Sequence, residues 1–285
     1  MELSMIFSDP FVRGIVLRAA TVGVLVALCG GLLGVTLVLK RYSMIGDGLS
    51  HVGFGAMALA PLLALLPGAA FLADYALEIS IPVVGAAAFF LLRLSENSRL
   101  GGDSAIALIS TASMAVGAIL YQVTTGMSSD ICSNLFSSAS VLNITNKDLL
   151  LSVILCSAVL LLFVLCYHRL FSVTFDENFC KATGGHPAVF KLLLALLTSV
   201  TVVLGIRMMG AVLVSAVIIF PALTAMRLFK SFRAVILCAA CISVVCFLIG
   251  FTIACLCSVQ TGPTVVLVNL AVFLLSTAFA RVKSR

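Results

Sequence analysis

Residues 14–39 read GIVLRAATVGVLVALCGGLLGVTLVL, a run of 26 residues with a single charged side chain, Arg18. A helix of about 20 apolar residues crosses a hydrocarbon core of about 30 Å, so this stretch is long enough to span a membrane. Its apolar residues follow one another without alternation, which favours a helix over a β-strand. The run exceeds the core of a signal peptide and no small-residue cleavage site follows it, so we expect it to stay attached.

The rest of the chain has the same character. Of its 285 residues, 62% are hydrophobic and 10% are charged, and the mean hydropathy is +1.26. These polar groups are too few to cover a water-soluble globule of this size. In lipid, each backbone polar group must be hydrogen-bonded within the fold, so only helices or a closed β-barrel can span it. The apolar runs are long and do not alternate, which favours helices. We therefore predict an all-α, polytopic transmembrane helical bundle that forms a single membrane domain over residues 1–285.

The apolar runs predict nine membrane-spanning helices, at residues 11–39, 47–66, 79–93, 104–125, 148–168, 188–206, 210–227, 234–257 and 263–280. The break between the sixth and seventh is the least certain, because a kinked or re-entrant pair at residues 207–210 would change the count. Totals from eight to ten are therefore compatible with the pattern.

Orientation follows from the distribution of Lys and Arg, which concentrate on the cytoplasmic side of membrane proteins. If the N-terminus lies outside and the C-terminus inside, 13 of the 17 cations fall in the cytoplasm. The exceptions are Arg13, Arg18, Lys147 and Arg207. The net charge of +6 is then explained by topology, and no nucleic-acid partner is implied.

Most of the ten cysteines lie inside apolar runs, where Cys behaves as a small hydrophobic residue. Cys238 and Cys241 have the C-x-x-C spacing, but their apolar surroundings favour packing over a redox or zinc pair. Cys132 and Cys180 are the two that we expect to be accessible.

Asp47 and His51 are the polar residues that the apolar pattern explains least. They are four residues apart and therefore share one face of a helix. A carboxylate with an imidazole suits zinc, manganese or iron, whereas calcium prefers oxygen ligands and copper(I) prefers sulfur. Ionisable groups inside a membrane usually mark a functional site. The alternative is that Asp47 caps the second helix and His51 satisfies it by a hydrogen bond.

The order of several short motifs resembles the ABC-3 family, the permeases of zinc and manganese ABC importers, nearly from end to end. The segments that carry this resemblance are GDGLSH at 46–51, DSAIAL at 103–108, FDENFCKATG at 175–184, GAVLVSA at 210–216 and TGPTVVL at 261–267. The chain departs from the family pattern at Cys180, where alanine is usual, and at Gln260 and Pro263.

The loop at residues 171–187 is too polar to remain in lipid, so we place it in the cytoplasm. Phe175 and Phe179 are four apart, and a short helix there would present a paired aromatic knob to an ATPase groove. From the residues alone, a plain solvated connector is the favoured interpretation. The resemblance implies that the loop is the coupling helix, which would include Phe175, Asp176, Phe179, Ala182 and Gly184.

The chain contains no G-x-x-x-x-G-K-(S/T) phosphate loop, so nucleotide must be bound by another polypeptide, and the chain alone is not expected to be an enzyme. The resemblance implies cytoplasmic ABC ATPases, an extracytoplasmic metal-binding protein and a second permease subunit, identical or paralogous. Close helix contacts in that permease pair would suit Gly30 with Gly34, or Gly53 with Gly55, although some of these glycines would pack within the subunit.

The function that this implies is import of zinc, manganese or iron across the bacterial cytoplasmic membrane by alternating access. The metal is the substrate, and no permanently bound cofactor is expected. Asp47 and His51 would replace water around the ion, and Asp103 would lie on its path. Two alternatives are a permease for a metal chelate such as a siderophore or cobalamin, and a membrane-embedded thiol or redox enzyme.

Overall fold

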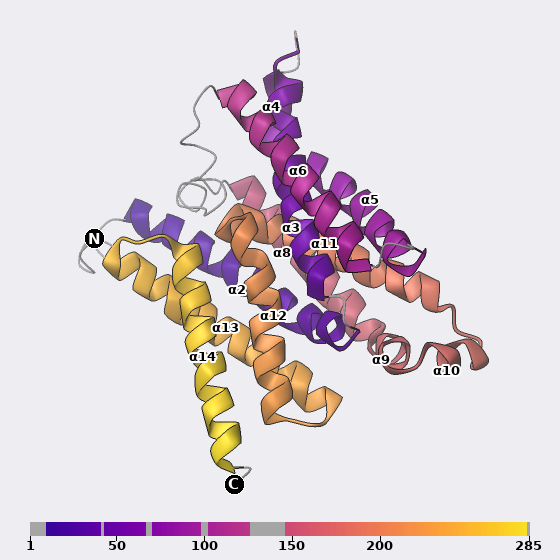
Figure 1. Cartoon of the computed structure of the whole chain (residues 1–285). Helices are drawn as coiled ribbons and strands as arrows, with labels where there is room; N and C mark the ends of the chain where they lie inside the picture. Colours follow the sequence, from indigo (N-terminus) through magenta and orange to yellow (C-terminus); the bar gives the residue numbers. More distant parts are fainter. Residues whose placement is uncertain (1–9, 41–42, 67–69, 98–101, 126–145, 284–285) are drawn as a thin grey trace.

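The computed structural model describes residues 10–40, 43–66, 70–97, 102–125 and 146–283. Within these ranges every regular element is a helix, which confirms the predicted all-α bundle (Figure 1). The elements in chain order are α2 (Pro10–Leu39), α3 (Ser43–Met57), α4 (Leu59–Ala64), η1 (Ala70–Tyr75), α5 (Ala76–Asn97), α6 (Gly102–Thr125), α8 (Asn146–Leu165), α9 (Tyr167–Phe175), α10 (Glu177–Ala182), α11 (Pro187–Met209), α12 (Ala211–Leu228), α13 (Phe232–Cys257) and α14 (Thr261–Lys283).

Helices occupy all nine predicted spans, and six helices in the described part of the chain are long and apolar enough to cross a membrane. The helices α5 and α12 contain shorter apolar segments, at Ala76–Leu91 and Val214–Leu228. The second predicted span differs most from the observed helices. Helix α3 starts at Ser43, four residues before the predicted start, and is separated from the short α4 by Ala58.

The uncertain break between the sixth and seventh spans is a real helix boundary. Helix α11 ends at Met209 and α12 begins at Ala211, with Gly210 between them at φ 83° and ψ 159°. Residues with a side chain rarely adopt positive φ, whereas glycine does so at little cost. Gly210 therefore ends one helix and starts the next within a single residue.

Helix α3 lies inside the bundle and packs against α5, α6, α11 and α12 (Figure 1). Its contact with α6 is close because a Cβ added to Gly55 would lie 2.8 Å from the carbonyl oxygen of Ser113. Glycines elsewhere act in the same way: Gly30 and Gly34 face Ile218 of α12. These glycines thus pack helices within the subunit, which is the second of the two roles expected for them.

Ion pairs tie helix ends together on opposite sides of the bundle. Arg207, near the end of α11, contacts Asp148 at the start of α8, with 2.7 Å between Nη2 and Oδ2. At the other end of α11, Lys191 contacts Glu177 of α10. The start of α11 and α10 therefore lie on one side, and the start of α8 lies on the other, as the predicted topology requires.

Candidate functional site

Asp47 and His51 lie together on α3, as their spacing predicts. Asp47 Oδ2 is 3.8 Å from His51 Nε2, and the two side chains are 46% and 17% exposed. Helix α3 starts at Ser43, so Asp47 lies in its second turn and not at the N-cap. A distance of 3.8 Å is also too long for a hydrogen bond. The alternative in which a capping Asp47 is satisfied by His51 is therefore not supported.

One ring nitrogen of His51 lacks a hydrogen bond within the described part of the chain. Its Nδ1 is buried and has no hydrogen-bond partner there. A buried polar atom without a partner is costly and is rare in folded proteins. Near the aspartate, the Ser50 hydroxyl donates a hydrogen bond to the backbone carbonyl oxygen of Asp47 at 2.7 Å. It therefore does not occupy the Asp47 carboxylate. Both side chains thus retain capacity for a ligand.

The pair alone does not complete a metal site. No group of three or more His, Cys, Asp or Glu side chains is placed to hold an ion among the residues that the structure describes. Zinc is usually bound by four ligands, and manganese accepts more oxygen ligands. Two ligands from α3 would form part of a site whose remaining ligands come from water, backbone or another polypeptide.

Asp103 lies in the first turn of α6, and the structure describes its backbone but not its side chain. One turn later, Ile106 packs against α3 beside Asp47, where a Cβ added to Gly48 would lie 2.8 Å from Ile106 Cγ2. The start of α6 therefore lies near the Asp47 turn of α3. The expected role of Asp103 on the path remains a prediction.

The predicted coupling loop contains two short helices rather than one. Helix α9 ends at Phe175, and Asp176 adopts an extended conformation before α10 begins at Glu177. The Asp176 carboxylate caps α10 by accepting hydrogen bonds from the backbone N–H groups of Asn178 and Phe179, at 2.9 and 3.0 Å. Such caps stabilise a helix start by about 1 kcal/mol. Asp176 therefore has a local structural role, and its expected coupling role remains a prediction.

The paired aromatic knob expected from Phe175 and Phe179 does not form on a single helix. Phe175 packs against Phe171 and Phe232, with ring centroids 4.8 and 5.6 Å away. Phe179 lies on the next helix, beyond the break at Asp176. Both phenylalanines are nevertheless well exposed. The loop therefore presents two separate aromatic side chains.

The chain turns at the end of α10. Ala182 is exposed at the last position of the helix, and Gly184 follows with φ 76°. The N–H of Gly185 donates to the carbonyl oxygen of Cys180 at 2.8 Å. The expectation that Cys180 is accessible is wrong, because this turn closes over its side chain and leaves it 1% exposed.

Among the other cysteines, Cys132 lies outside the described residues. In the C-x-x-C pair, Cys238 is partly buried and Cys241 is exposed. The two belong to no group of metal-ligating side chains in the described ranges. Nothing in their placement favours a zinc or redox site.

Glu177 is a candidate functional residue that the sequence did not indicate. Its carboxylate binds Lys40, at the end of α2, at 2.8 Å and Lys191, in α11, at 2.7 Å. The side chains of Lys40 and Lys191 are only 5% and 14% exposed, whereas that of Glu177 is 36% exposed. Partial burial raises the pKa of the Glu177 carboxyl, but the bonds and charges of Lys191 and Lys40 outweigh it and lower the pKa.

This three-residue contact joins α10 to the end of α2 and to α11, and α3 begins shortly after Lys40 in the sequence. Lys40 precedes the start of α3 at Ser43 by three residues, and Asp47 follows one turn later. Glu177 is 137 residues away from Lys40 in sequence, so no local sequence pattern predicts their contact. The two ion pairs therefore hold α10 against the end of α2 and the start of α11.

The chain is similar to known membrane transport proteins over nearly its whole length. The sequence model of the ABC 3 transport family matches residues 13–280. The manganese transport system membrane protein MntC of Halalkalibacterium halodurans is 30% identical over 266 residues, covering 92% of this chain and 86% of that protein. A probable iron transport system membrane protein of Haemophilus influenzae is 27% identical, with 96% of each chain covered. The solved structure of PsaBC from Streptococcus pneumoniae in complex with Fab matches with a TM-score of 0.81 and 25% identity, covering 96% of this chain and 93% of that chain.

Proposed function

We propose that this chain, which belongs to the ABC 3 transport family, is the permease subunit of a bacterial importer for a divalent transition metal. The observation that carries the choice of substrate is the Asp47 and His51 pair, with a buried, unpartnered imidazole nitrogen and a half-exposed carboxylate on one helix face. Relatives named for manganese and iron transport support the same substrate class.

The transport path requires a charged ligand set. A dehydrated divalent ion is costly in a medium of low dielectric constant unless charged and polar groups replace its water. Two ligands per chain are fewer than such an ion needs, so we place one Asp47 and His51 pair from each of two permease subunits around the same ion. The second permease is either an identical chain or a paralogue.

Energy for transport comes from another polypeptide, because the chain has no phosphate-binding loop of its own. In the proposed complex, α10 and the exposed Phe175 and Phe179 contact cytoplasmic ABC ATPases. An extracytoplasmic binding protein delivers the metal to the opposite face. Alternating access then exposes the metal pair first to that protein and later to the cytoplasm.

The function is tested by reconstituting the permease with its ATPase and binding protein in vesicles. Mn²⁺, Zn²⁺ or Fe²⁺ is expected to accelerate ATP hydrolysis and to accumulate inside, whereas iron–siderophore and cobalamin are expected to do neither. The reason is that a bulky chelate already saturates its metal and leaves no position for a carboxylate and an imidazole. Transport of a chelate, with no response to free ions, would replace the proposal with the chelate permease.

Orientation is tested separately with two cysteine substitutions in described connections. Lys230 lies between α12 and α13, and Val259 lies between α13 and α14. With the N-terminus outside, Lys230→Cys is expected to react with a membrane-impermeant maleimide only in inverted vesicles, and Val259→Cys only in right-side-out vesicles. The parent chain measures the reaction of the native cysteines. The opposite pattern would reverse the topology.

A further inference from the structure

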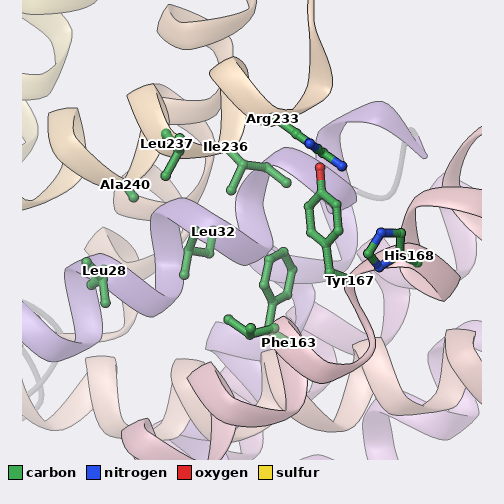
Figure 2. Close-up of a pocket in the computed structure, with 10 residues that line it drawn as sticks. Leu28, Leu32, Phe163, Tyr167, His168, Arg233, Ile236, Leu237 and Ala240 are labelled. Carbon is green, nitrogen blue, oxygen red and sulfur yellow. The ribbon is translucent and has the colours of Figure 1, made fainter.

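A groove of about 580 Å³ lies between α2, α8, α9 and α13, away from α3 (Figure 2). Its walls are apolar along most of their length, with Leu28 and Leu32 from α2, Phe163 from α8 and Ile236 from α13. The volume falls in the range of roughly 300–1,000 Å³ that is usual for small-molecule sites. The groove is therefore large enough for part of a ligand rather than for a few waters.

The groove opens sideways, into the medium that surrounds the helices. Val164 and Leu237, on two of its walls, are both 67% exposed. They belong to Asn146–Leu165 and Phe232–Cys257, which are long and apolar enough to cross a membrane. Apolar side chains at this depth face hydrocarbon rather than water. The medium at the groove is thus the acyl region of the bilayer.

Polar side chains gather at one end only. Arg233 is the second residue of α13, and His168 follows the end of α8 by three residues, so both lie at the boundary of their spans. Tyr167 stands between them, with its hydroxyl directed toward the Arg233 side chain (Figure 2). Among the described residues, no carboxylate lies within ion-pair distance of Arg233. Its positive charge is available to a ligand.

We propose that this groove binds an anionic phospholipid, with an acyl chain along Leu28, Leu32 and Ile236 and the phosphate at Arg233. Ala240 follows Arg233 by seven positions, a rise of about 10 Å along α13, so the apolar wall continues from the headgroup level into the hydrocarbon. Tyrosine suits the boundary because its ring is apolar and its hydroxyl polar. Basic pockets between transmembrane helices are a recurring way to bind acidic headgroups. The site is independent of the metal path.

The chain contains no tryptophan, which provides a direct assay. Leu237→Trp places a single fluorescent reporter at the edge of the groove, where exposure of the native side chain leaves room for the larger ring. Leu275→Trp on α14, at a native side chain that is 69% exposed, gives a matched reporter away from the groove. The full chain is reconstituted in phosphatidylcholine, and quenching is measured with dibrominated phosphatidylglycerol or dibrominated phosphatidylcholine.

At Leu237→Trp, brominated phosphatidylglycerol is expected to bind on the order of fivefold more strongly than brominated phosphatidylcholine, because one cation near the surface contributes about that factor. Leu275→Trp is expected to show no preference. Adding Arg233→Gln should remove the preference, whereas Lys230→Gln, which neutralises an exposed cation outside the groove, should retain it. Equal quenching by both lipids at Leu237→Trp, or a preference that survives Arg233→Gln, would overturn the proposal. So would the absence of quenching by either lipid, which would mean that protein covers the groove.

Discussion

Replacement of Asp47 by asparagine is expected to reduce metal uptake by on the order of 100-fold or more, with the folded chain and its complex intact. Asparagine keeps the size of the side chain and removes its negative charge. Each 1.4 kcal/mol of lost ligand free energy weakens binding tenfold, and a charged ligand to a dehydrated ion contributes several kcal/mol. His51→Ala is expected to act in the same direction with a smaller effect, because imidazole is a neutral ligand when it binds metal.

Uptake of radioactive Mn²⁺ or Zn²⁺ into vesicles containing the reconstituted importer gives the measurement. Two matched controls are available. Ser50→Ala removes the hydroxyl that bonds the Asp47 carbonyl and tests whether local helix disturbance is sufficient. His186→Ala removes an exposed imidazole at the start of α11, where it makes no capping bond. Both controls should transport normally. If uptake were also normal in Asp47→Asn and His51→Ala, the pair would not be the metal site.

Much of the fold and this part of the site are predictable from the sequence because they depend on local periodicity. Nine apolar runs appear as helices near their predicted positions. Asp47 and His51 are four residues apart, and one helical turn brings them together whatever the rest of the fold does. Gly210 is likewise a local signal, since its position between two apolar runs coincides with a backbone conformation that glycine adopts readily.

What the sequence could not provide depends on contacts between distant segments. The burial of Cys180 results from a turn that folds back over it, and its polar surroundings in sequence indicate the opposite. The break at Asp176 also escapes the pattern of Phe175 and Phe179, because the same four-residue spacing fits a continuous helix. In structure, the aspartate caps a new helix and separates the two rings. Glu177 belongs to this class as well, since its partners come from α2 and α11.

Glu177→Gln is expected to uncouple ATP hydrolysis from transport. The carboxylate holds α10 to Lys40 and Lys191, and a charge-assisted hydrogen bond contributes about 1.5–3 kcal/mol. The 36% exposure of Glu177 places the effect toward the lower end of that range, because water screens the interaction. A loss of about 1.4 kcal/mol corresponds to a factor of ten. We therefore expect metal uptake per ATP hydrolysed to fall about tenfold while basal hydrolysis persists.

The measurement compares basal hydrolysis, hydrolysis stimulated by the metal-loaded binding protein, and uptake in the same vesicles. Asp148→Asn is the matched control, because it breaks the ion pair with Arg207 on the opposite side of the bundle. It is expected to lower thermal stability without changing the ratio of uptake to hydrolysis. Lys181→Gln, which removes an exposed charge from α10, should leave that ratio unchanged as well. If Glu177→Gln lowered stability and preserved the ratio, the contact would hold the fold together without transmitting motion from α10 to the helix that carries Asp47.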